Sequence, residues 1–311
     1  MEKIYFKSEV ILNESDINLL SKVIKDIHQQ KFLYLSLKKI ISSKSMKLCA
    51  IFLGKKIVSF AIYMSRKWII NNLNYQSISI GYVTTLPEFQ GKGYAKMLFE
   101  NIEKLCKEKK IDFLYLQGIE NFYTKLGFQG FSYKSKFIFN RKDFNRPKGK
   151  IIDFKDSNKN DIKKIHQNYC DRRKIFIERG EFIWDDLFKS LSDTYLFFKP
   201  NIILDNKYNP ILYFCTTPGD KKTIREFITC DNFKKVEEAI SLIFDDLRFK
   251  NQKELEIFSP RDGILFELAK FKGANFVEFI KPNSSNMIKI LNDKISLEDL
   301  KGSFLLQADN A

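Results

Sequence analysis

The sequence is poor in the side chains that build metal centres and disulfide frameworks. It holds two histidines, His28 and His166, and its five cysteines are widely scattered with no Cys-x-x-Cys spacing. A cysteine-ligated metal site or a disulfide scaffold is therefore not expected, and scattered thiols are typical of a reducing compartment. Two histidines are also few for a histidine-ligated metal or a histidine-based triad, so we expect no metal cofactor.

Long apolar runs are absent as well. No stretch approaches the roughly 20 residues that a membrane-spanning helix needs. Residues 1–6 begin no apolar segment with a small-residue cleavage site. These two absences predict a cytoplasmic protein without a membrane span.

Acidic residues are outnumbered, with 38 Asp and Glu against 53 Lys and Arg and a formal net charge of +15. Such a surface can attract nucleic acid, an anionic membrane or an anionic cofactor, or lysine can simply be the common surface residue. The lysines are spread along the chain and form no dense block. This spread favours the last interpretation, and we expect no nucleic-acid partner.

The most informative stretch is residues 82–95. Residues 82–84 have strand character, and Pro87 ends any ladder because proline has no N–H. Residues 90–95 fit the pattern Q-x-x-G-x-A, and from there apolar residues recur at spacings of three and four, as on one face of a helix. A strand therefore runs into a glycine loop that opens a helix.

A loop of this kind suits a phosphate group. The first turn of a helix leaves N–H groups without partners and carries the positive end of the helix dipole. Gly91 and Gly93 allow a close backbone approach to an anion, and Lys92 and Lys96 add positive charge. The ending Gly-Lys-Gly excludes a Walker loop, and the lack of a third glycine excludes the dinucleotide fingerprint. A pyrophosphate site and an ordinary strand-to-helix turn remain as the two interpretations.

Two motifs place this stretch in a family context. Residues 83–95, V-T-T-L-P-E-F-Q-G-K-G-Y-A, closely resemble the acetyl-CoA motif of the GNAT N-acetyltransferases, in which a strand leads into Q/R-x-x-G-x-G/A at the start of a helix. Residues 122–128, F-Y-T-K-L-G-F, resemble the second family motif, a tyrosine followed four residues later by glycine and an aromatic residue. The order and separation of the two motifs are family-like. The resemblance covers the first half of the chain well and the second half weakly.

The resemblance implies roles for individual residues. In the family, a splayed strand holds the pantetheine and thioester of acetyl-CoA, and the glycine loop holds the pyrophosphate. Tyr123 matches the tyrosine near the thioester sulfur and is the expected general acid, a role that suits a phenol whose unperturbed pKa is about 10. A core aromatic of a short helix is the alternative for Tyr123. The implied cofactor-binding residues are Val83, Thr84, Thr85, Gln90, Gly91, Lys92, Gly93, Tyr94 and Ala95.

The general base is not identified by the sequence. Many relatives carry a carboxylate in the strand before the loop, but residues 77–82 offer none. Glu120 is a nearby alternative, although a glutamate at the start of a helix is also explained by the helix dipole. Deprotonation through ordered water and a substrate amine of low pKa are equal alternatives. In the second half, Asp220, Arg225 and Glu226 are conjectural substrate contacts at a domain interface.

The periodicity predicts an α/β (α+β) architecture for residues 1–143. The element order β-α-α-β-β-β-α-β-α-β is the GNAT order, and it implies a mixed, mostly antiparallel twisted sheet flanked by helices. A second helix is expected over 32–40, and a strand over 131–139 is expected to close the sheet. Residues 141–150 are polar, with one proline and one glycine, and read as a linker.

Residues 150–311 repeat a similar element order without the chemistry. Where the glycine loop should precede the long helix, residues 229–235 read T-C-D-N-F-K-K, and a diphosphate there would meet an aspartate. We therefore predict a degenerate second GNAT-like domain whose sheet is closed by strands over 276–280 and 287–291. Two such domains, with only the first motif intact, resemble the N-terminal part of the Eis-type acetyltransferases.

These expectations combine into one leading function. The resemblance implies an acetyl-CoA-dependent N-acetyltransferase that passes an acyl group from the CoA thioester to a primary amine by direct attack. The acceptor is a small-molecule amine or a protein amine, and self-association is left open. The alternative is a catalytically inactive acyl-CoA-binding or interaction protein with a GNAT fold, an interpretation motivated by the missing strand carboxylate.

Overall fold

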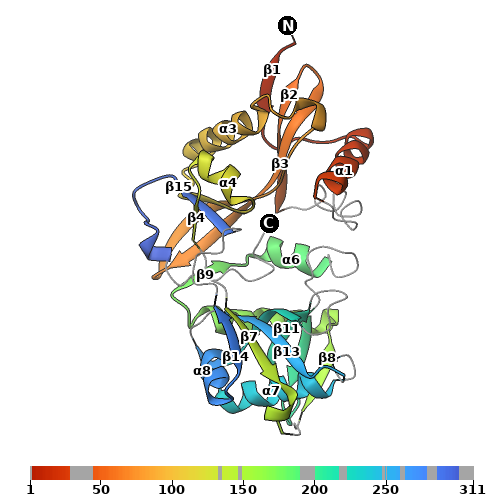
Figure 1. The fold of residues 1–311 in the computed structure, drawn as a ribbon, viewed down its shortest axis with the longest axis vertical. Coiled ribbons are helices and arrows are strands. Elements are labelled where there is room, and N and C mark those ends of the chain that lie inside the picture. Colours follow the sequence, from red (N-terminus) through yellow and green to blue (C-terminus); the bar gives the residue numbers. More distant parts are fainter. Residues whose placement is uncertain are drawn as a thin grey trace.

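The computed structural model describes residues 2–28, 45–131, 135–145, 149–189, 200–216, 223–246, 249, 251–259, 263–278 and 286–300. Figure 1 shows two lobes, each built on its own sheet. The first lobe holds an eight-stranded sheet and the second lobe a seven-stranded sheet. The mixed sheets flanked by helices confirm the predicted fold class.

The first lobe follows the predicted element order closely. In its sheet the strands run β1-β2-β3-β4-β5-β15-β6, and β4 and β5 pair in parallel while the other neighbours pair antiparallel. The predicted helix over 32–40 lies outside the described residues. The first-half elements of this lobe are β1 Ile4–Lys7, α1 Glu14–His28, β2 Met46–Leu53, β3 Lys56–Ile70, β4 Leu73–Thr85, α3 Tyr94–Glu108, β5 Phe113–Gln117, α4 Glu120–Tyr123 and β6 Gln129–Gly130.

Strands β3 and β4 form a hairpin much longer than the sequence indicated. Asn71 and Asn72, at its tip, both have positive φ, 50° and 66°, as a two-residue hairpin turn requires. Beyond the first core the strands carry polar residues, which hid their strand character from a periodicity argument. The extension pairs with β9 (Ile175–Glu178) of the second half of the chain, so the hairpin joins the two lobes.

Helices cover both faces of the first sheet. Helix α3 packs Leu98, Phe99 and Ile102 onto one face. Helix α1 packs Leu20 and Ile24 onto the opposite face. The strand-loop-helix stretch that dominates the sequence therefore lies between β4 and the helix that covers it.

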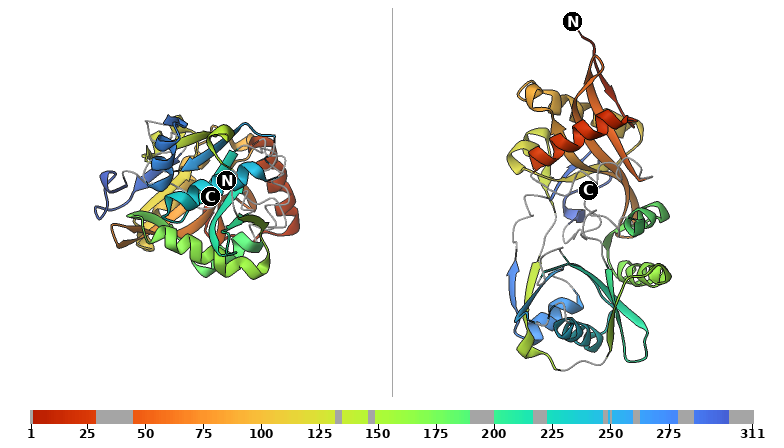
Figure 2. Two further views of the ribbon diagram at one scale, coloured as in Figure 1. Left: turned by 90° about the horizontal axis from the view of Figure 1, so that it is seen from below. Right: turned by 90° about the vertical axis from the view of Figure 1, so that its right-hand side faces the viewer.

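The second lobe repeats the plan of the first. Its strands run β14-β7-β13-β12-β11-β10-β8, and β12 and β13 form the parallel pair. Helices α7 and α8 pack on one face and α5 and α6 on the other (Figure 2). Its elements are β8 Lys150–Asp153, α5 Lys159–Cys170, α6 Glu181–Lys189, β10 Pro200–Leu204, β11 Pro210–Thr216, β12 Thr223–Ile228, α7 Phe233–Asp245, β13 Glu254–Ser259, α8 Ile264–Phe271 and β14 Asn275–Glu278.

The two lobes exchange one strand each, and this corrects two predictions. Strand β7 (Ser135–Asn140), expected to close the first sheet, pairs with β13 and β14 in the second. Strand β15 (Asn286–Ile290), expected in the second sheet, lies between β5 and β6 in the first. In Figure 1 the blue β15 accordingly sits among the early strands. Alternating apolar residues predict a strand but not its partner, because the same period fits either sheet.

The exchange also bears on the predicted division into 1–143 and 150–311. Strand β7 from before that division belongs to the second sheet, and β9 and β15 from after it belong to the first, so the sheets do not follow the division. For the other helices and strands, the division between residues 143 and 150 stays a prediction.

A truncated chain of residues 1–143 should therefore fail to fold as a unit. Without β15 the edge of β5 loses its partner, and buried residues such as Phe113 and Tyr115 lose Ile288 from their core cluster. Denaturant titration followed by circular dichroism should show a cooperative transition for the full chain and none for the truncated one. A cooperative transition in the truncated chain would contradict the requirement for exchange.

Candidate active site

Strand β4 leaves its parallel neighbour near its carboxyl end. The ladder between β4 and β5 ends at the pair Ile80–Leu116, while β4 continues beside β3 to Thr85. A bulge with Tyr82 at φ 52° lies just beyond this point. Bulges re-aim a strand and end its pairing, so β4 and β5 diverge here and open the edge of β4 that carries Val83.

The glycine loop follows this opening. A short 3-10 turn over Pro87–Phe89 leads to Gln90, whose side-chain amide donates to the Thr85 carbonyl over 3.2 Å. Gly91 and Gly93 have φ of 74° and 83°, in the left-handed region that favours glycine. A Cβ at either glycine would find open space within 4 Å of its position among the described atoms. The loop is thus shaped by backbone conformation, with room above it.

The start of α3 differs from the start of its counterpart α7. Gly93 occupies the N-cap of α3, and no described side chain caps that first turn. At α7 the side chain of Asn232 accepts a hydrogen bond from the Lys235 N–H over 3.0 Å. The first N–H groups of α3 therefore have no described side-chain partner, whereas α7 satisfies one with its own chain. That the loop before α3 holds a phosphate stays a prediction.

Positive side chains lie close to the loop. Nζ of Lys92 donates to the Glu88 carbonyl over 2.9 Å and stands 5.2 Å from the centroid of the Phe89 ring. Lys96 extends from the first turn of α3 and lies 3.9 Å from Glu100. Both lysines are exposed, so each can turn toward an anion at the helix start without loss of a buried contact.

Tyr123 closes α4 against the core beneath the loop. Its side chain is 8% exposed, and its ring lies edge-on to Phe99 of α3 at a centroid distance of 5.7 Å. A Cβ on Gly118 would overlap the Tyr123 ring, so a residue without a side chain is needed there. Burial raises the pKa of the Tyr123 phenol to about 12. The core cluster that contains Tyr123 is also in contact with Val83 and Tyr94, so the strand, the loop and the tyrosine share one apolar cluster.

Strand β4, which precedes the loop, carries no aspartate or glutamate that could act as the base. Ser77 and Ser79 occupy the buried face of β4. Glu120 is exposed at the start of α4. Glu226 does not fit the conjectured substrate contact, because it is fully buried and paired with Arg179, and Asp220 lies outside the described residues.

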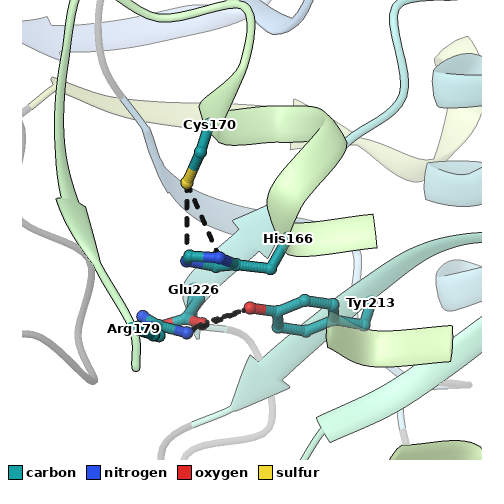
Figure 3. Close-up of polar contacts among 5 residues, drawn as sticks. All are labelled: His166, Cys170, Arg179, Tyr213 and Glu226. Atoms are coloured by element: carbon teal, nitrogen blue, oxygen red, sulfur yellow. Dashed lines mark hydrogen bonds and ion pairs between the residues drawn. The ribbon is translucent and has the colours of Figure 1, made fainter. Parts of the chain in front are cut away.

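The sequence analysis missed a buried polar cluster in the second lobe, shown in Figure 3. Arg179 donates to both carboxylate oxygens of Glu226, at 3.0 and 3.2 Å, and the Tyr213 hydroxyl donates to the same carboxylate over 2.8 Å. Above this pair, Cys170 Sγ lies 3.6 Å from Nδ1 of His166. Burial and the nearby Arg179 hold the pKa of His166 well below its usual range, so the imidazole is neutral. The spacing of four residues on one helix was the available signal for the His166–Cys170 pair.

A cavity of about 360 Å³ opens beside this cluster. It lies between α5, β9 and α6, and its walls include His166, Arg179 and Trp184. Since Arg179 is already neutralised by Glu226, the cavity has no free buried charge from that residue.

The Arg179–Glu226 pair should matter for stability. Both side chains are 0% exposed, and removing one partner of a buried pair leaves an uncompensated charge. We expect Glu226→Ala to lower the free energy of unfolding by about 3–5 kcal/mol. Urea titration measures this loss. Glu88→Ala is the control, because the ion pair of Glu88 with Lys56 is half exposed and its removal should change the free energy of unfolding far less. Equal small losses in both variants would contradict a structural role for the buried pair.

Comparison with known proteins finds a family whose model matches the part of the chain that holds this site. The model of the GNAT acetyltransferase domain matches residues 17–131, the part of the chain that holds the glycine loop and α4. No protein with a curated description matches the sequence. Among the described residues, no helix combines the length and apolar character that crossing a membrane requires.

Solved structures resemble both lobes together. A probable N-acyltransferase of Enterococcus faecalis has a TM-score of 0.72 at 14% identity, covering 93% of this chain and 73% of its own. Eis1 of Mycobacterium abscessus has a TM-score of 0.62 at 10% identity, with coverages of 92% and 74%. A tandem GNAT protein from the clavulanic acid biosynthesis pathway has a TM-score of 0.55 at 6% identity, with coverages of 94% and 100%. At these identities the likeness shows the fold. Residues 17–131 therefore match the GNAT acetyltransferase domain, and the chain as a whole has the fold of tandem GNAT proteins.

Proposed function

We propose that the protein is an acetyl-CoA-dependent N-acetyltransferase whose donor site lies in the first lobe. One observation carries the proposal. The ladder between β4 and β5 ends at Ile80, while β4 itself ends at Thr85. Six residues later the chain reaches Gly91, and Gly91 and Gly93, both with positive φ, lead into α3. An open strand edge followed by an uncapped helix start offers backbone groups to an extended ligand and N–H groups to its phosphates.

The residues at this site fit acetyl-CoA. The loop from Gln90 to Ala95 would hold the pyrophosphate, because its glycines leave space that any Cβ would occupy. The diverging edge of β4, with Val83, Thr84 and Thr85, would hold the pantetheine through backbone groups. Bound there, acetyl-CoA supplies an activated thioester carbonyl for attack by an amine.

Tyr123 is proposed as the general acid. As the nitrogen lone pair of a neutral amine forms the new C–N bond, the C–S bond breaks and Tyr123 gives its proton to the sulfur. The tyrosinate then regains a proton from the acylated nitrogen. One amine and one thioester thus give one amide and one thiol, and Tyr123 returns to its protonated form. With a pKa of about 12, the phenol holds its proton at neutral pH until a thiolate forms beside it.

The acceptor must reach the site as a neutral amine. The buried face of β4 offers Ser77 and Ser79 in place of a carboxylate, so ordered water or the solvent would take the proton of the ammonium form. The acceptor is proposed to be a primary amine on a small molecule or a protein. The second lobe would shape the pocket, because β9 pairs directly with β3 of the first sheet.

The lack of a carboxylate also favours a second candidate, an acyl-CoA-binding protein that no longer turns over. Two measurements separate the candidates. Isothermal titration with acetyl-CoA tests the donor site, and release of free CoA thiol with a panel of primary amines tests transfer. Binding with amine-dependent thiol release supports the enzyme, and binding without release from any amine supports the second candidate. The absence of binding by folded protein would exclude both.

A further inference from the structure

The buried face of the first sheet opposite α3 has a polar gap between two apolar clusters. On β3, Phe60 and Ile62 belong to the cluster under α1, while Trp68 and Ile70 belong to a second cluster with Ile177 of β9. Arg66 lies between these two groups on the same face, because side chains alternate along a strand. Its side chain is 3% exposed.

The neighbouring strand continues this gap. Arg66 is the register partner of Ser77 on β4, and Met64 is the partner of Ser79, so Arg66 and both serines share one face. The same register places Tyr115 of β5 and Ile288 of β15 beside them. On this face of the described strands β3, β4, β5 and β15, Arg66 carries the only charge.

The Ser77 hydroxyl donates to the Arg66 carbonyl over 3.2 Å, but other polar atoms of the gap lack partners among the described residues. Nε and one terminal nitrogen of Arg66 make no hydrogen bond within the described part of the chain, and the same is true of the Ser79 hydroxyl. No ion pair of Arg66 occurs there either, in contrast to Arg179, which is equally buried and fully paired. A buried guanidinium without a counter-charge is unfavourable, and such a group is retained where a ligand supplies the missing charge.

We propose that Arg66 binds a carboxylate of the acceptor, so that the preferred substrate is a primary amine that also carries a carboxylate group. That the ligand is an amine rests on the proposed function, acetyl transfer. The planar fork of a guanidinium matches a carboxylate, which can accept two parallel hydrogen bonds from it. The Ser79 hydroxyl supplies a neutral hydrogen-bond donor on the side of Arg66 that faces the proposed acetyl-CoA site.

The position of Arg66 sets a length for this acceptor. Its partner Ser77 precedes Ile80, the last β4 residue paired with β5, by three residues, or about 10 Å along the strand. The amine must reach the thioester beyond Ile80 while the carboxylate stays at Arg66. An amine and a carboxylate separated by several bonds fit this span better than the adjacent groups of glycine.

Thermal unfolding tests the state of Arg66 without any ligand. We expect Arg66→Met to raise Tm, because it removes an uncompensated buried charge and keeps an unbranched side chain. The matched variant Arg179→Met should lower Tm, since it leaves Glu226 buried without its partner. A fall in Tm for Arg66→Met like that for Arg179→Met would show that Arg66 is paired within the folded chain and would overturn the proposal.

Ligand pairs test the carboxylate itself. Glycine, 4-aminobutyrate and 6-aminohexanoate are each compared with their primary amides at equal ionic strength. For the wild type we expect the longer acids to raise Tm and their amides to leave it unchanged, and Arg66→Met to respond to neither. In thiol-release assays kcat/KM for the best acid should exceed that for its amide by about 100-fold, and this ratio should collapse in Arg66→Met.

The outcomes separate this inference from the proposed function. Acids and amides that act alike on the wild type overturn the carboxylate site. Preserved acetyl-CoA binding in Arg66→Met, measured by titration, shows that the donor site is intact. If the acids raise Tm through Arg66 but no amine releases thiol, the carboxylate site stands and the acetyl transfer fails.

Discussion

Gly93→Glu is expected to weaken acetyl-CoA binding by at least about 100-fold. Two effects act together at this position. The residue has φ 83°, where a side chain other than glycine costs about 1–3 kcal/mol. The new carboxylate also sits at the N-cap of α3, where it occupies the space and the N–H groups that the pyrophosphate needs, and it repels the phosphates. Isothermal titration of wild type and variant measures the loss.

Gly263→Glu is the matched control for this change. Gly263 is the N-cap of α8 in the second lobe, has φ 91°, and faces open space among the described atoms, as Gly93 does. The control therefore introduces the same residue and the same charge at a helix start. Its backbone strain is at least as large, because Gly263 has ψ −172°, in a region essentially restricted to glycine, whereas Gly93 has ψ 1°. We expect it to lose stability and to bind acetyl-CoA normally. Equal binding by both variants would exclude the glycine loop as the phosphate site.

Tyr123→Phe is expected to lower kcat by about 100-fold with acetyl-CoA binding unchanged, because general acid catalysis contributes roughly 10²–10⁴. The ring packs against Phe99 and Phe128, and phenylalanine keeps these contacts. Tyr63→Phe is the matched control. Tyr63 belongs to the same core cluster, and its hydroxyl has no hydrogen-bond partner among the described residues. An unchanged kcat in Tyr123→Phe would exclude Tyr123 as the general acid and leave it only a packing role in the core.

The pH dependence of the reaction follows from the raised pKa of Tyr123. Because burial moves that pKa from the ordinary 10 to about 12, the folded protein keeps the proton throughout the range below 12. We expect kcat to rise as the acceptor amine loses its proton and to show no fall between pH 8 and pH 10. The unfolded phenol ionises near 10, so stability from this group is complete below pH 10 and is lost as pH rises through 12. A falling limb near pH 8 would require another acid.

Local elements were predictable because their signals are local. The glycine loop and α3 combine a proline, two glycines and a helical period within one stretch, and the structure places the helix over Tyr94–Glu108 as expected. The roles of the loop residues and of Tyr123 remain predictions.

Partners across the chain were not predictable in the same way. The strand exchange depends on which sheet buries β7 and β15, and both strands carry an alternating pattern that fits either one. Arg66 gave no signal, since a lone arginine in a polar stretch reads as exposed until its neighbours on β4 are known. Strand β9 was missed because it is four residues long and its partner is the distant tip of a hairpin.

The exchanged strand β15 has a consequence for synthesis of the chain on the ribosome. The first sheet is complete only when residues 286–290 have emerged, about 170 residues after its β5 neighbour. At 5–20 residues per second this leaves the edge of β5 and its aromatic residues without their partner for roughly 10–30 s. During that interval β7 has already emerged and offers an alternating strand to the same edge. The partners of β7 in the second sheet, β13 and β14, emerge only over residues 254–278, so β7 also lacks its partners for most of that interval. Correct assembly therefore requires that β7 remain off the β5 edge until the second sheet can bind it.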